Sequence, residues 1–245
     1  MKKKKKAPVN KKTGLVLILD FILVFSILVF LPPVGYYSEI QAFWQEPKVA
    51  AAHFVIPPPS PIAKNLSNIP APLLTAKSAV ILDVSSGMIL FQKNALEPLP
   101  QASTTKIMTA LVALEYYLPD QILEVPDNFR DGQNLKLMKG EKWPVKSLVY
   151  ALLVSSANDA AEILAANYES GRIGFIQRMN QKAKDFSLSD THFVNPTGID
   201  EDGQYSSAID LARLASIAIR NPLFFQVVST PESIIYNEDR QISRK

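Results

Sequence analysis

The sequence of 245 residues contains no cysteine and only two histidines, His53 and His192. A chain without cysteine forms no disulfide bond, has no thiolate nucleophile or cysteine-ligated zinc, and carries no cysteine-linked lipid. The two histidines are too few and too far apart for a histidine-based metal site. We therefore expect neither a metal nor another cofactor.

Acidic residues are missing from residues 1–14, which hold seven of the 26 basic residues of the chain. The formal net charge is +3, but without these seven residues 19 basic side chains face 23 acidic ones, a net charge of −4. The basic character therefore belongs to the amino-terminal tail. The rest of the chain lacks the positive surface that nucleic acid requires, which excludes nucleic acid as a partner.

Charge is almost absent from Leu15–Leu31, which reads LVLILDFILVFSILVFL. As a helix these seventeen residues span roughly 26 Å, near the short limit for the hydrocarbon core of a bilayer. The lysine-rich tail precedes the segment and residues 32–47 contain no Lys or Arg, so the positive-inside rule places residues 1–14 in the cytoplasm. We expect an uncleaved single-pass anchor in the cytoplasmic membrane, with everything after it outside the cytoplasm.

The same segment has two other interpretations, a cleaved signal peptide and a buried core helix. A signal peptide also combines a basic start with an apolar stretch. Its small-residue cleavage site would be Ala50–Ala52, about nineteen residues beyond the apolar run, and this distance favours the anchor. Residues 32–72 are then an extracytoplasmic linker, which prolines stiffen from Ile56 to Pro72, and residues 73–245 form the soluble domain.

Residue patterns in the soluble domain predict many helices and one β-hairpin. Two short apolar runs, Ala76–Val84 and Met88–Gln92, flank the turn cluster Ser85–Gly87 and predict two antiparallel strands. A stretch with glycines and no helical period, Phe129–Pro144, predicts loop and short strand. Apolar residues at helical spacing predict five helices, at Thr105–Leu118, Val145–Val154, Ala157–Tyr168, Gly174–Phe186 and Ser207–Arg220.

A first candidate for chemistry is Ser103-Thr104-Thr105-Lys106, at the start of a predicted helix. Residues three apart share a helix face, so the Lys106 amine can reach the Ser103 hydroxyl. Serine needs a base to become a nucleophile, and lysine acts as one when burial lowers its pKa. The alternative is a helix-capping serine followed by a solvated lysine.

A second candidate is Ser156-Ala157-Asn158, between two predicted helices. The Ser156 hydroxyl and the Asn158 amide can project from a tight turn towards one cleft, where a hydroxyl relays a proton and an amide holds a substrate carbonyl. The alternative is an ordinary helix cap.

Together, QASTTKIMTALVALE and LVYALLVSSANDAAEILA resemble the serine D-alanyl-D-alanine carboxypeptidases, which are penicillin-binding proteins of low molecular mass and belong to the peptidase S11 family. The likeness extends to AVILDVSSGMILFQKNALEPLPQAS, FIQRMNQKAKDFSLSDTHFVNPTGID and YSSAIDLARLASIAIRNP. It covers the chain from about Ala76 to the end. It implies an α+β fold of the β-lactamase and transpeptidase type, in which a helical cluster packs against an antiparallel sheet.

The resemblance also implies a role for each candidate residue. Ser103 would be the acylated nucleophile and Lys106 its general base. Ser156 would carry a proton to the leaving D-alanine, and Asn158 would bind the peptide backbone of the substrate. The expected substrate is the stem peptide of peptidoglycan, with β-lactams as inhibitors. Thr197 stands where the family often has a histidine.

The third motif of the family, Lys-Thr-Gly, occurs in this sequence only at Lys12–Gly14. That triplet lies on the cytoplasmic side of the expected anchor, so it cannot line the same cleft. In the family the working triplet lies on a strand downstream of the last helix. We therefore expect a chain truncated before this motif, with the carboxy-terminal strands of the fold absent and with no activity from residues 73–245 alone.

Two other functions stay open at this point. One is a non-catalytic wall-binding or scaffold relative without the third motif. The other is a serine β-lactamase that uses Ser103 and Lys106. Carboxypeptidase and endopeptidase action both fit the motifs.

Overall fold

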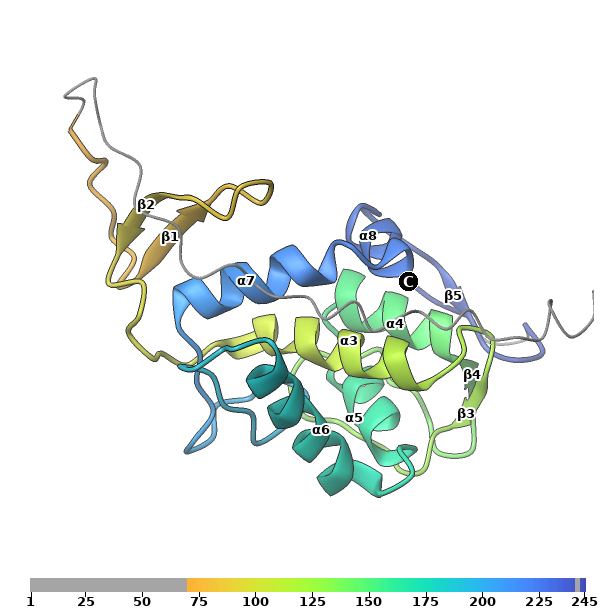
Figure 1. Ribbon diagram of the computed structural model, residues 1–245. Coiled ribbons are helices and arrows are strands. Elements are labelled where there is room, and N and C mark those ends of the chain that lie inside the picture. Colours follow the sequence, from red (N-terminus) through yellow and green to blue (C-terminus); the bar gives the residue numbers. More distant parts are fainter. Residues whose placement is uncertain (1–69, 241–242) are drawn as a thin grey trace, which may run out of the picture. The chain divides into compact units, whose positions relative to one another are not determined.

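Helices dominate the computed structural model, which describes residues 70–240 and 243–245 (Figure 1). The basic tail, the expected anchor at 15–31 and nearly all of the expected linker lie outside these residues. Within the described part of the chain, no helix has both the length and the hydropathy needed to cross a bilayer.

The predicted hairpin is confirmed. Strand β1 (Ala79–Leu82) pairs antiparallel with β2 (Ile89–Lys93), and Ile81 lies opposite Phe91. The Asp83 carboxylate organises the turn by accepting hydrogen bonds from the backbone N–H groups of Ser85 and Ser86. Hydrogen bonds from the Ser86 and Ser85 hydroxyls, together with these two backbone bonds, lower the pKa of Asp83 to about 2.

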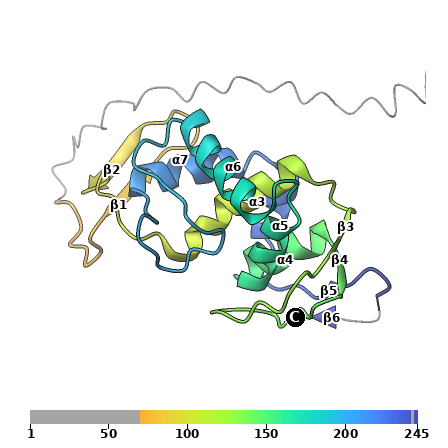
Figure 2. The same cartoon turned by 90° about the horizontal axis from the view of Figure 1, so that it is seen from below.

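The hairpin is covered on one face by α7 (Ala208–Ala218), which packs on β1 (Figure 2). Ile209 of this helix joins Ile89 and Ala95 in a small apolar cluster. The cover matters because an isolated two-stranded hairpin is marginally stable in water.

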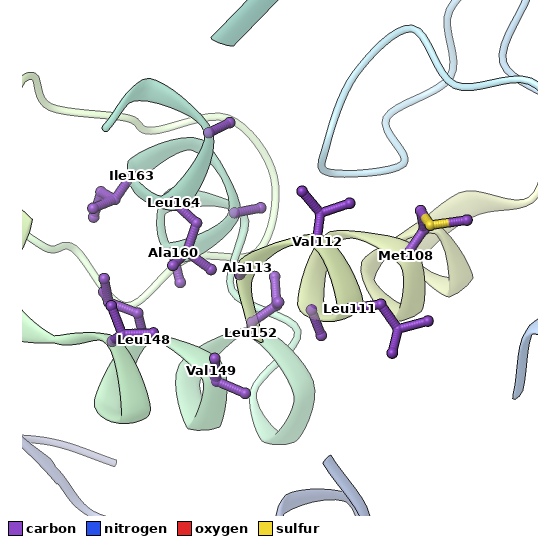
Figure 3. Packing of buried hydrophobic residues seen from close by; sticks show 14 of the residues in the cluster. Met108, Leu111, Val112, Ala113, Leu148, Val149, Leu152, Ala160, Ile163 and Leu164 are labelled. Carbon is purple, nitrogen blue, oxygen red and sulfur yellow. The ribbon is translucent and has the colours of Figure 1, made fainter. Parts of the chain in front are cut away.

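The core forms around α3 (Lys106–Tyr116). This helix contacts α4 (Val145–Val154), α5 (Asn158–Ala166), α6 (Gly171–Asp185) and α7. Figure 3 shows apolar side chains of α3, α4 and α5 meeting in one cluster, namely Met108, Leu111, Val112, Ala113, Leu148, Val149, Leu152, Ala160, Ile163 and Leu164.

All five predicted helices are confirmed by α3 to α7, with ends that shift by up to three residues.

One helix has no counterpart in the sequence prediction. Helix α8 (Pro222–Val228) is capped by the Asn221 side chain, whose oxygen accepts the N–H groups of Leu223 and Phe224. An asparagine cap followed by proline is a known start signal. Seven residues are too few to show a helical period, so apolar spacing does not predict this helix.

The remaining strands are short. Strand β3 (Ile122–Glu124) pairs with β4 (Lys142–Pro144), and β5 (Ile235–Tyr236) pairs with β6 (Ser243–Arg244). Strand β4 confirms the short strand expected within 129–144. The strands of the described residues thus form three separate antiparallel pairs.

Candidate active site

The two residues of the first candidate motif lie in contact at the start of the central helix. Ser103 is exposed on a short 3-10 turn, η1 (Ala102–Thr105), which leads directly into α3. Lys106, the first residue of α3, is only 3% exposed. Its amine Nζ lies 3.2 Å from the Ser103 hydroxyl oxygen, within hydrogen-bond distance.

The Lys106 amine has a second oxygen partner that the sequence motifs did not indicate. Nζ donates a hydrogen bond of 2.7 Å to the backbone carbonyl of Thr197, 91 residues further along the chain. Because this acceptor belongs to the backbone, a threonine in place of the family's frequent histidine leaves it available.

Burial determines the charge state of this lysine. Removing the amine from water disfavours its charged form and lowers its pKa from 10.5 to about 8. About a tenth of Lys106 is then neutral at pH 7, far more than for a solvated lysine. A neutral amine beside a serine hydroxyl is able to accept the hydroxyl proton.

The loop that carries Thr197 fits closely against the turn that carries Ser103. Gly198 has a φ of +85°, and a Cβ added to it would lie 1.9 Å from the carbonyl oxygen of Ala102. Ala102 itself has a φ of +46°, in the left-handed region that residues other than glycine seldom adopt. The turn before the serine is therefore held in an unusual conformation by a backbone that lies against it.

The second candidate motif lies between α4 and α5. Ser156 is half-buried with a left-handed φ of +54°, and Asn158 begins α5 with 7% of its surface exposed. The Asn158 amide donates a hydrogen bond of 3.0 Å to the carbonyl of Asp131. In the described part of the chain, no hydrogen bond joins the Ser156 side chain to Ser103 or Lys106.

A cavity of about 410 Å³ lies beside Asn158 of the second motif, and its lining does not include Ser103 or Lys106. Its lining includes Asn158 and Thr197, so the amide of the second motif and the residue that contacts Lys106 border the same space. The other lining residues are Asn128, Phe129, Arg130, Asp131, Glu162, Arg172 and Ile199. Within residues 70–240 and 243–245, no group of three His, Asp or Glu side chains is placed to hold a metal ion.

Asp159, next to Asn158, is a structural residue that the sequence analysis gave no role. Its buried carboxylate accepts the backbone N–H groups of Leu135 and Leu137, each at 3.0 Å. These two bonds fix the loop at Leu135 and Leu137. The same loop carries the Asp131 carbonyl that accepts the Asn158 amide. In the sequence, the signal for this role is an acidic residue beside Asn158 within the largely apolar stretch ANDAAEILA.

The close fit of Gly198 predicts a sharp effect of Gly198→Ala. The added methyl group overlaps the Ala102 carbonyl and must displace Ser103 or the loop. If Ser103 is the nucleophile that the resemblance implies, its acylation by a fluorescent penicillin should slow by about 10² or more, since displacements near 1 Å have effects of that size. The rate constant of acylation checks this.

Gly140→Ala is the matched control, because Gly140 has the same φ of +85° but no atom within 4 Å of an added Cβ. It carries the backbone strain without the overlap. Equal loss of acylation in both variants would contradict a specific contact between Gly198 and Ala102.

The chain matches a family of known peptidases. The profile of the peptidase S11 family, described as D-alanyl-D-alanine carboxypeptidase, matches residues 66–242. The carboxypeptidase DacF of Bacillus subtilis is 34% identical over 65% of this chain and 43% of its own length. A D-alanyl-D-alanine endopeptidase of Pseudomonas aeruginosa is 34% identical over 66% of this chain and 53% of its own length. The chain spans about half the length of these relatives.

Solved structures give the same result for the fold. A D-alanyl-D-alanine carboxypeptidase of Mycobacterium tuberculosis superposes with a TM-score of 0.68 and 28% identity, over 74% of this chain and 70% of that one. A variant of a Streptomyces DD-transpeptidase gives a TM-score of 0.65 and 32% identity, over 71% of this chain and 73% of that one. The predicted α+β fold of the transpeptidase type is therefore confirmed. The family match, the relatives and the shared fold establish that this chain belongs to the D-alanyl-D-alanine carboxypeptidase family, peptidase S11.

Proposed function

We propose that the protein is a serine-type D-alanyl-D-alanine carboxypeptidase, which removes the terminal D-alanine of peptidoglycan stem peptides through an acyl-enzyme on Ser103. The observation that carries this proposal is the buried Lys106 amine, with its lowered pKa, 3.2 Å from the Ser103 hydroxyl oxygen. Family membership and the names of the relatives support the substrate class. They do not favour a scaffold protein or a β-lactamase.

Acylation begins with a proton transfer. Neutral Lys106 takes the hydroxyl proton of Ser103 while the serine oxygen bonds to the carbonyl carbon of the penultimate D-alanine. The carbonyl oxygen becomes an oxyanion, and the backbone N–H of Ser103 is one donor that stabilises it. A tetrahedral intermediate results.

Collapse of this intermediate breaks the bond between carbon and nitrogen. The terminal D-alanine leaves as an amine after receiving the proton that Lys106 took up, and the family resemblance assigns the delivery of this proton to Ser156. Asn158 holds the peptide backbone of the substrate beside the cavity. Water then hydrolyses the ester, which frees Ser103 and releases the shortened peptide.

Penicillin tests the nucleophile directly, because its strained lactam resembles the D-alanyl-D-alanine amide. We expect a labelled penicillin to form a stable covalent adduct on Ser103 of the full-length protein, located by mass spectrometry. Ser103→Ala should form no adduct and should melt within a few degrees of the wild type, since the serine is exposed.

An adduct that persists in Ser103→Ala would show that another residue is the nucleophile. Rapid release of hydrolysed penicillin in place of a stable adduct would favour a β-lactamase. Release of D-alanine from a stem pentapeptide, compared with cleavage of a cross-linked dimer, separates carboxypeptidase from endopeptidase action.

The pKa of Lys106 predicts how acylation depends on pH. Only the neutral amine accepts a proton, so the rate constant of acylation should rise about tenfold per pH unit below 8 and level off above it. Lys106→Arg stays charged throughout this range and should lose about 10² to 10⁴ in rate. Acylation that does not change between pH 6 and pH 8 would exclude Lys106 as the base.

We propose, from the sequence alone, that Leu15–Leu31 anchors the protein in the cytoplasmic membrane with the catalytic domain outside. The mature protein should keep its lysine-rich amino terminus and stay with the membrane fraction after a high-salt wash. Salt releases proteins that are bound by charge and leaves spanning helices in place. A mature amino terminus near Ala52 would instead indicate a cleaved signal peptide.

A further inference from the structure

The segment Phe193–Gly198 contains the backbone acceptor of Lys106 and is held by side chains from α3 and from a neighbouring loop. The Thr109 hydroxyl of α3 donates a hydrogen bond of 2.6 Å to the Pro196 carbonyl. The buried amide of Gln204 accepts the N–H of Val194 at 2.7 Å. Neither contact involves the peptide unit between Thr197 and Gly198, whose carbonyl accepts the Lys106 hydrogen bond.

That peptide is organised by one buried side chain, Asn195, which is 3% exposed. Its oxygen Oδ1 accepts hydrogen bonds from the Thr197 N–H at 3.2 Å, the Thr197 hydroxyl at 3.0 Å and the Gly198 N–H at 2.8 Å. Its nitrogen Nδ2 donates to the Ile199 carbonyl at 2.9 Å and to the Glu201 carboxylate at 3.1 Å. The partners also settle which end of the amide is oxygen, because three are donors and two are acceptors.

These bonds hold the backbone on both sides of the Thr197 carbonyl. The peptide unit that contains this carbonyl joins Thr197 to Gly198, and Asn195 holds the N–H groups of both residues. Since a peptide unit is planar, fixing its N–H also fixes the direction of its C=O. The asparagine therefore sets where the acceptor of Lys106 points.

We propose that Asn195 is a positioning residue that acts through the Thr197 carbonyl to orient the Lys106 amine towards Ser103. The proposal rests on the proposed function, in which Lys106 is the base. A neutral amine has two N–H groups and one lone pair. The carbonyl only accepts, so it takes one N–H at 2.7 Å and limits the rotation of the amine about its last bond. The lone pair is then more often directed at the serine hydroxyl.

The chain offers a matched control in Asn180 of α6. Its oxygen accepts the Phe193 N–H at 2.9 Å, and its nitrogen donates to the Phe193 carbonyl at 2.7 Å. Asn180 thus holds the same segment by the same chemistry, two residues before Asn195, without contacting the peptide that faces Lys106. Loss of either asparagine removes contacts to this segment, but only loss of Asn195 should change the orientation of the Lys106 amine.

The test compares Asn195→Ala with Asn180→Ala in the full chain. Acylation by a fluorescent penicillin should slow by about 10-fold to 100-fold in Asn195→Ala and by less than about threefold in Asn180→Ala, because small misplacements of a catalytic group have large effects. A rate in Asn195→Ala within about threefold of that in Asn180→Ala would overturn the proposal. If Asn195→Ala does not fold, Asn195→Ser takes its place, with an expected loss of at least about fivefold, because one hydroxyl cannot serve three donors.

A second measurement needs no reaction. In protein with isotope-labelled lysine, the NMR signal of the Lys106 side chain is the one that Lys106→Arg removes. We expect it to shift in Asn195→Ala and to keep its position in Asn180→Ala. An unshifted signal in Asn195→Ala would overturn the positioning role. This result is independent of acylation, so a wild-type protein that fails to react with penicillin would count against the proposed function and not against the role of Asn195.

Discussion

The contact of one buried amine with two oxygens connects the separate parts of this structure. Lys106 touches the Ser103 hydroxyl three residues before it and the Thr197 carbonyl 91 residues after it. Accepting a proton from Ser103 requires that the start of α3 be covered, because an amine in water would stay charged. The helices around α3 provide that cover, and the loop at 195–198 closes it from the other side. The fold thus brings a base and a hydroxyl together in surroundings that lower the pKa of the base.

Two of the six non-glycine residues with a positive φ in the described part of the chain lie in or beside the candidate motifs. Ala102 and Ser156 both have a left-handed φ, and each adjoins or belongs to a candidate motif. Such conformations cost energy and persist only where the surroundings hold them. Gly198 does this for the first turn by lying against Ala102. Beside the second turn, Asp159 of α5 binds the neighbouring loop through two backbone N–H groups.

The sequence was informative where one segment determines its own structure. The spacing of Ser103 and Lys106 is local, and the apolar periods of α3 and α4 are long, so both the pair and the helices were predictable. The Thr197 carbonyl was not, because a backbone acceptor leaves no trace in residue type and meets Lys106 only through tertiary folding. Helix α8 and the pairs formed by β3 and β5 were missed because each is too short to show a period. The catalytic roles of Ser103, Lys106, Ser156 and Asn158 stay predictions until the variants are measured.

The burial that makes Lys106 reactive also lowers the free energy of unfolding of the domain. Below pH 8 the amine is charged in both the folded and the unfolded chain, and the folded state bears the full cost of holding that charge away from water. Between pH 8 and 10.5 the unfolded chain binds more protons than the folded one, so stability rises with pH across this interval. The free energy of unfolding is therefore lowered most by this residue at neutral and acidic pH. An apolar side chain at position 106 would relieve that cost and remove the base, which makes this lysine a site where folding and reactivity impose opposite demands.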